Sequence, residues 1–277
     1  MTVLRLVLVG TGTGVGKTHV GCALIGAGEA LGFETVGLKP IETGVGAPSA
    51  GGEPDRPLTR PSAGGEPDRP LTRPSAGGEP DRPLIRASTV ASDQDRLEEV
   101  ARGFHVKRGS TTFHVKRSPY QFADPISPHL AARKAGVRID LAVVVNWVRD
   151  HSAPFTVVES AGGLFSPLAD SVTNLDLVAA LGPAVAVLVA PDRLGVLHDV
   201  TATRGLAVAR GLPIRAVVLS APVEPDASTG QNAPELTRLG IAQLLAVFPR
   251  AAPSDPRSIA AATAVIQWAQ QLAQLGS

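Results

Sequence analysis

Short, continuously apolar segments alternate with amphipathic segments along most of the chain. Val3–Val9 is aliphatic except for Arg5, as expected for a strand that is covered on both faces. Lys17–Leu31 instead places apolar residues three and four positions apart, which is typical of a helix. This change of period recurs toward the C-terminus. It predicts strands at 3–9, 35–38, 154–159, 184–190, 214–219 and 244–248, and helices at 17–31, 93–102, 127–136, 139–151, 174–181, 194–210, 233–239 and 257–275.

Strands that alternate with helices in this way indicate an α/β fold with a central, mainly parallel sheet. The helices that connect parallel strands cover both faces of such a sheet. Ligands then bind beyond the carboxyl ends of the strands. We therefore expect a single α/β domain over residues 1–277, with its ligand site at that edge of the sheet.

Residues 48–86 interrupt the alternation with a tandem repeat. The sequence PSAGGEPDRPLTR occurs at 48–60 and 61–73, and PSAGGEPDRPLIR follows at 74–86. Each copy is rich in proline, glycine and charge, and it has too few apolar residues to build a core. We therefore expect a flexible insertion rather than a solenoid. A shorter duplication, FHVKR, occurs at 104–108 and 113–117.

Composition and charge narrow the class of protein. The net charge is +1, with 18% charged and 44% hydrophobic residues, so nothing favours a nucleic acid or a membrane as partner. Cys22 is the only cysteine and lies in a predicted helix, where we expect a buried core residue. The chain has no leader pattern at its start and no apolar run of membrane-spanning length, which predicts a cytoplasmic protein.

The sequence GTGTGVGKT, residues 10–18, lies between the first predicted strand and the first predicted helix. Glycines allow consecutive backbone N–H groups to turn toward an anion, and the helix N-terminus adds its positive end. Lys17 supplies a charge for the outer phosphates, and Thr18 supplies a hydroxyl for Mg²⁺. Thr11 stands where the usual phosphate loop begins with glycine, so the loop from Gly10 is one residue longer. The motif predicts a site for ATP or GTP.

A second lysine and several carboxylates follow other predicted strands. Lys39 ends the second strand and could lie over a transferred phosphoryl group or be a solvated strand end. Glu159 ends a buried strand, and Asp93 and Asp95 follow the insertion. Mg²⁺ prefers oxygen ligands, which Thr18, Glu159 and one of the two aspartates could supply. The alternatives are a capping or ion-pair role for Glu159 and a helix first-turn charge for Asp93.

Four motifs occur together in the order GTGTGVGKT, KPIETG, SPHLAA and ESAGG. Their order and spacing resemble the dethiobiotin synthetase family over most of the chain, apart from the insertion and the FHVKR region. The resemblance implies a homodimer with a P-loop fold and a seven-stranded parallel sheet. It also implies an ATP- and Mg²⁺-dependent ligase that closes a cyclic urea on 7,8-diaminononanoate with CO₂. The reaction would pass through a carbamate and a carbamic-phosphoric anhydride to dethiobiotin, ADP and phosphate, a step of biotin biosynthesis.

The resemblance also implies roles for individual residues. Lys17 and Lys39 would be catalytic and flank the γ-phosphate and the carbamate, and Thr43 would contact the substrate. Thr18, Asp93 and Glu159 would hold Mg²⁺. The nucleotide site would consist of Gly12, Thr13, Gly14, Val15, Gly16, Lys17, Thr18, His19, Asp93, Glu159, Ser160, Ala161, Gly162, Ser220, Ala221, Pro249, Arg250 and Ala251.

Several positions depart from the family pattern. Gly12 replaces an aspartate in the loop, and Ser160 replaces a glycine after Glu159. Ser220 replaces an asparagine that would read adenine, which leaves open whether the nucleotide is ATP. His198 lies where the family shows an asparagine, which leaves the contacts to the substrate tail open.

Two other protein classes share the predicted fold. The first is a ParA- or MinD-like ATPase switch that acts on a protein partner. Such switches usually carry a second lysine inside the phosphate loop, where this chain has threonine or glycine. The second is an amidotransferase-type synthetase, which needs a catalytic cysteine that Cys22 does not suit. The switch is the main alternative to the ligase.

Overall fold

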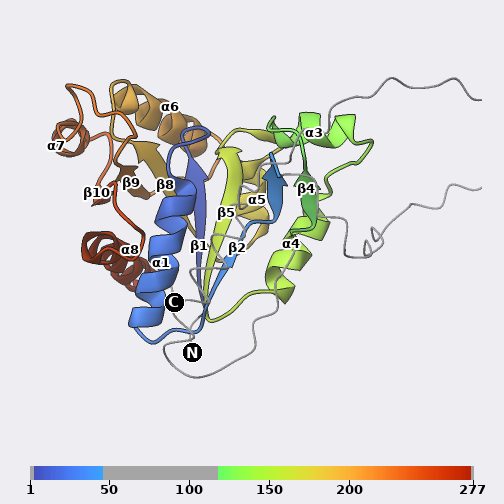
Figure 1. The fold of residues 1–277 in the computed structure, drawn as a ribbon, viewed down its shortest axis with the longest axis horizontal. Coiled ribbons are helices and arrows are strands. Elements are labelled where there is room, and N and C mark those ends of the chain that lie inside the picture. The colour runs from blue at the N-terminus through green and yellow to red at the C-terminus, as the bar shows by residue number, and fades with distance from the viewer. Residues whose placement is uncertain (1–2, 46–117, 276–277) are drawn as a thin grey trace, which may run out of the picture. The chain divides into compact units, whose positions relative to one another are not determined.

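The computed structural model describes residues 3–45 and 118–275, which Figure 1 draws as a coloured ribbon. The insertion at 48–86, both FHVKR copies and the helix predicted at 93–102 lie outside these residues. The elements in chain order are β1 (Leu4–Gly10), α1 (Lys17–Ala30), β2 (Thr35–Leu38), β3 (Ile41–Thr43), β4 (Tyr120–Phe122), α3 (Pro128–Lys134), α4 (Leu141–Asp150), β5 (Phe155–Gly163), β6 (Pro167–Ala169), β7 (Val172–Thr173), α5 (Asn174–Ala180), β8 (Val185–Pro191), α6 (Val196–Ala209), β9 (Ala216–Ser220), α7 (Asn232–Arg238), β10 (Leu244–Phe248) and α8 (Pro256–Leu275).

The main sheet has six strands in the order β10-β9-β8-β1-β5-β2. Every neighbouring pair in it is parallel. This confirms the predicted α/β fold with a mainly parallel sheet. The strand number differs from the seven that the resemblance implies, because the other strands of the described residues pair separately, β3 with β4 and β6 with β7.

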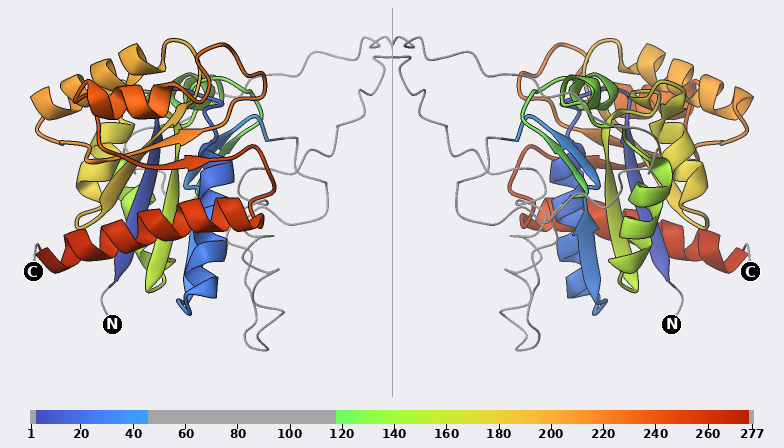
Figure 2. Two further views of the ribbon diagram at one scale, coloured as in Figure 1. Left: turned by 90° about the vertical axis from the view of Figure 1, so that its left-hand side faces the viewer. Right: turned by 90° about the vertical axis from the view of Figure 1, so that its right-hand side faces the viewer.

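Successive residues of the central strand β1 contact opposite helix layers. Leu6 and Leu8 belong to the cluster formed with α1 and α8, whereas Val7 and Val9 belong to the cluster on the other face. The two views in Figure 2 show α1 and α8 on one side of the sheet and α4 on the other. Because both faces are covered, β1 reads as a continuous apolar run rather than as an alternating one.

Most predicted elements occur within two residues of their predicted bounds at each end, except that β5 extends to Gly163. The strands β3, β4, β6 and β7 were not predicted, because two or three residues are too short to show a period of two. Cys22 is buried within α1, as expected. Among the helices of the described residues, none combines the length and the apolar character that crossing a membrane requires.

The parallel sheet brings distant parts of the sequence to one edge. β1 ends at Gly10, β2 at Leu38 and β5 at Gly163, while β8 and β9 end at Pro191 and Ser220. Since carboxyl ends of parallel strands lie at the same edge, the residues that follow them meet there.

Candidate functional site

The loop between β1 and α1 is packed tightly against two neighbouring strands. The N–H of Thr11 donates to the carbonyl of Val189, and the carbonyl of Gly10 accepts from the N–H of Leu164 at 2.8 Å. A Cβ on Gly10 would lie 2.6 Å from the carbonyl oxygen of Gly12. Gly16, just before α1, has a φ of 94°, which disfavours any residue with a side chain. Gly10 therefore allows a close approach of the backbone to Gly12 that a Cβ would prevent, and Gly16 allows a positive φ that other residues rarely adopt.

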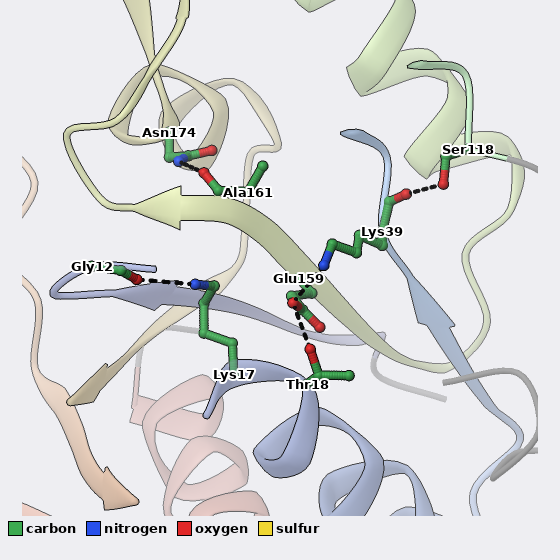
Figure 3. Close-up of polar contacts among 8 residues, drawn as sticks. All are labelled: Gly12, Lys17, Thr18, Lys39, Ser118, Glu159, Ala161 and Asn174. Atoms are coloured by element: carbon green, nitrogen blue, oxygen red, sulfur yellow. Dashed lines mark hydrogen bonds and ion pairs between the residues drawn. The ribbon is translucent and has the colours of Figure 1, made fainter. Parts of the chain in front are cut away.

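Lys17 curls back over this loop. Its side chain begins at the first residue of α1, and its Nζ donates to the carbonyl of Gly12 at 3.2 Å (Figure 3). Only 6% of the residue is exposed. The loop thus holds an ammonium group in place at the point where anions meet the helix N-terminus.

Glu159 joins the phosphate loop to the end of β2. Its Oε1 accepts a hydrogen bond from Thr18 Oγ1 at 3.0 Å and an ion-pair contact from Lys39 Nζ at 3.0 Å (Figure 3). Lys39 and Glu159 are 7% and 2% exposed, so this ion pair is buried. The Ser118 hydroxyl donates to the main-chain oxygen of Lys39. The solvated strand end that was the alternative for Lys39 is therefore wrong, and Glu159 does form the ion pair that was considered for it.

A cavity of about 690 Å³ lies over these groups. It contains most of the residues predicted for the phosphates, the metal and the substrate: Thr13, Gly14, Gly16, Lys17, Thr18, His19, Lys39, Thr43, Glu159, Ser160, Ala161 and Gly162. Its remaining lining was not predicted and consists of Pro125, Ile126, Ser127, Pro128 and Ser166. The SPHLAA motif contains two of these residues, and it was the only sequence signal for them.

A second cavity, of about 340 Å³, lies beside the first. Its lining includes the predicted residues Gly14, Val15, Gly16, His19, Ser220, Ala221, Pro249, Arg250 and Ala251, together with Pro191, Pro222 and Val223, which were not predicted. Ser220 is buried, and its Oγ lies 2.3 Å from where a Cβ on Gly16 would be. The lining combines proline, valine and alanine residues with the polar side chains of Ser220 and His19, and Arg250 supplies an exposed positive charge.

His19 lines both cavities. Its ring meets that of Phe248 edge-on, with the centroids 6.4 Å apart, and its buried Nε2 has no hydrogen-bond partner among the described residues. Burial lowers the pKa of His19, a hydrogen bond with the main chain of Pro249 opposes this shift, and the charge of Arg250 adds to it. His19 is thus a neutral ring at ordinary pH, placed where the two cavities meet.

The predicted metal ligands are partly brought together. Thr18 and Glu159 are in contact, and the second carboxylate oxygen of Glu159 has no hydrogen-bond partner within residues 3–45 and 118–275. Asp93 and Asp95 lie outside those residues. In the same part of the chain, no group of three or more His, Cys, Asp and Glu side chains is placed to hold a metal ion. His198 is exposed and lines neither cavity.

The chain is similar in sequence to known proteins. A family model described as an AAA domain matches residues 82–258. The ATP-dependent dethiobiotin synthetase BioD of Anaeromyxobacter dehalogenans strain 2CP-C is 35% identical over 247 residues, which cover 88% of this chain and 89% of the relative. The protein of the same name from Caulobacter vibrioides strain NA1000 is 30% identical over 226 residues, covering 80% and 82%.

Among solved structures, the septum site-determining protein MinD of Pyrococcus horikoshii OT3, complexed with Mg-ADP, has a TM-score of 0.51 and 16% identity. The alignment covers 100% of this chain and 99% of that chain. At this identity the likeness concerns the fold alone.

Proposed function

The chain belongs to the dethiobiotin synthetase family, and we propose that it is the ATP-dependent ligase that converts 7,8-diaminononanoate and CO₂ to dethiobiotin. ATP would be split to ADP and phosphate in the same reaction. The names and the extent of the curated relatives support this assignment. The observation in the structure that carries it is the meeting of Lys17, from the start of α1, and Lys39, from the end of β2, in one cavity with Thr43.

The chemistry needs such a cluster of cations. An amine of the substrate would add to CO₂ to give a carbamate, and a carbamate oxygen would attack the γ-phosphorus with loss of ADP. The second amine would then attack the carbamic carbon, close the ring and expel phosphate. Each step gathers anionic oxygens in one place, and fixed positive charges stabilise them most effectively in a water-poor cavity.

The position of each residue in the cavity suggests its role in the reaction. Lys17, held over the phosphate loop, would contact the outer phosphates of ATP. Lys39 would lie between the transferred phosphoryl group and the carbamate, and Thr43 would position the diamine. Because both amines belong to one substrate, ring closure is intramolecular and needs no side-chain nucleophile.

Mg²⁺ fits the oxygens at the centre of this cavity. Thr18 and Glu159 would hold it, and the unpartnered oxygen of Glu159 supports this, because a buried carboxylate oxygen normally has a partner. Asp93 is our proposed further ligand. The ion would reduce the negative charge of the phosphates, and its arrival would compete with Lys39 for Glu159.

The smaller cavity would receive the base of the nucleotide. Ser220, Ala221, Pro249, Arg250 and Ala251 would surround it, with Gly12 to Gly16 leading to the phosphates. The proline, valine and alanine residues in its lining suit the faces of a flat ring.

An assay of phosphate release tests the proposal directly. We expect release from Mg–ATP to require both bicarbonate and diaminononanoate, with dethiobiotin formed in equal amount. Hydrolysis that ignores the diamine and is stimulated by a protein partner would instead favour the ParA- or MinD-like switch, which only the fold supports. Lys39→Met, for which we expect a large loss of turnover, serves as the low-activity reference.

We further propose that the chain is one domain with a flexible insertion at 48–86, and that it forms a homodimer in the cytoplasm without nucleic acid or membrane partners. Light scattering after gel filtration measures the dimer. Deletion of 48–86 tests whether the insertion affects the reaction: unchanged turnover would support an inert insertion, and loss of turnover in a folded protein would refute it.

A further inference from the structure

One wall of the larger cavity is formed by Ala161 and Gly162 near the end of β5, and Gly163 follows directly. Behind this wall lies Asn174, the first residue of α5, which is fully buried at 0% exposure. Its Nδ2 donates to the carbonyl of Ala161 at 2.6 Å and to the carbonyl of Gly163 at 2.8 Å. One side-chain amide therefore holds the carbonyl groups on both sides of Gly162, which lines the cavity.

Main-chain N–H groups at the start of α5 also bond to the chain that follows this wall. The N–H of Leu175 donates to the carbonyl of Leu164, and the N–H of Asn174 donates to the carbonyl of Ser166. Figure 3 shows the Ala161 carbonyl pointing toward Asn174 and away from Lys17. The wall is thus fixed from the side opposite Lys17.

The orientation of these carbonyls fixes the direction of the N–H groups. In a trans peptide the C=O and the N–H that follows it point in opposite directions. The peptide after Gly163 shows this, because its carbonyl bonds to Asn174 while the N–H of Leu164 donates to Gly10 of the phosphate loop. By the same geometry, the N–H of Gly162 points away from Asn174, toward the side on which the phosphate loop lies.

We propose that Asn174 is a positioning residue that makes this wall compatible with an anion. With Asn174 in place, the carbonyl oxygens of Ala161 and Gly163 are turned out of the wall, and Gly162, which lines the cavity, presents its N–H. A backbone N–H that faces a phosphate or carbamate oxygen stabilises it, whereas a carbonyl oxygen in that position repels it. This inference rests on the proposed function only in requiring that the cavity receive phosphate.

Two substitutions distinguish a role of Asn174 in the cavity wall from a role at the start of α5. Asn174→Leu keeps the size and removes both hydrogen bonds. Asn174→Asp keeps the shape, but its carboxylate repels both carbonyls while its charge suits the N-terminus of α5. If Asn174 served the helix alone, the aspartate variant would resemble the wild type. We expect both variants to bind ADP at least about tenfold more weakly, with the aspartate variant worse, because the wall is misplaced.

Thr156→Val is the matched control. Thr156 is a buried polar residue of the same strand β5, and its hydroxyl makes two hydrogen bonds to the main chain of Ala153. This variant should lose stability and keep its ADP affinity. Calorimetric titration with Mg–ADP, on variants shown by circular dichroism to be folded, makes the measurement. ADP binding within twofold of wild type in Asn174→Asp, or equal weakening in Thr156→Val, would overturn the proposal.

A measurement on the wild type covers the case in which the variants do not fold. In an amide NMR spectrum, the Gly162 signal should move when Mg–ADP with aluminium fluoride is added, and the Thr156 signal should not. A stationary Gly162 signal, at a ligand concentration that moves Lys17, refutes the role of Asn174. If the wild type binds nucleotide but makes no dethiobiotin, the proposed function fails while this inference is still decided by the binding data.

Discussion

The two cavities share Gly14, Gly16 and His19, yet they differ in where their charged groups lie. The larger one contains two buried ammonium groups, a buried carboxylate and the helix start that follows the glycine loop. The smaller one has proline, valine and alanine walls and an exposed arginine. A phosphate needs a few charges at fixed positions, whereas a base needs flat apolar contact from many small groups. Single substitutions should therefore have large effects in the first cavity and small effects in the second.

Lys39→Met should produce the largest effect. It removes a cation from the transferred phosphoryl group, and we expect kcat/KM for Mg–ATP to fall by about 10²–10³-fold. It also leaves Glu159 buried without that partner, which should destabilise the fold by about 3–5 kcal/mol. The phosphate-release assay at low temperature, with unfolding followed in urea, measures both.

Arg250→Met is the matched control in the smaller cavity. Arg250 is exposed, so the loss of its charge should change kcat/KM by less than about threefold. Equal effects at the two positions would break the contrast between the cavities.

Val223→Ala should produce an intermediate effect confined to binding. Removing two methylene-sized groups from the apolar wall should raise KM for Mg–ATP about fivefold with kcat unchanged, since the contact is the same in ground and transition states. Val208→Ala is the matched control, because Val208 is 60% exposed and Val223 69%, and Val208 lines neither cavity. A fall in kcat for Val223→Ala would mean that the smaller cavity takes part in the chemistry.

His19→Gln should produce the smallest effect, on pH dependence. Because the pKa of His19 is lowered in the folded state, the unfolded chain binds more protons between that lowered pKa and the ordinary value. The free energy of unfolding should therefore fall as pH decreases from 7.5 through this window, and less so in the glutamine variant. Urea unfolding at pH 7.5 and pH 5.5 provides the comparison. If the free energy of unfolding changed by the same amount between these pH values in both proteins, the lowered pKa of His19 would be contradicted.

The same contrast explains what the sequence could predict. The strands and helices with a clear apolar period were predicted, and so were Lys17, Lys39 and Glu159, because charged residues next to buried strands are chemically conspicuous. Pro222 and Val223 carry no such signal, since any loop holds residues of these types. Asn174 was predicted only as a helix start, because its two carbonyl partners become neighbours through the fold and not through spacing.

The hydrogen bond between Ser118 and Lys39 has a consequence for how long the sequence between these two residues can be. Val45 also donates to Phe122, and β3 pairs with β4, so the residues on either side of 46–117 are fastened together by contacts of the described core. The entropy of closing a loop grows only with the logarithm of its length, and a doubling costs about 0.6 kcal/mol. Copies of the proline-rich unit can therefore be gained or lost between these anchors at almost no thermodynamic cost to the core.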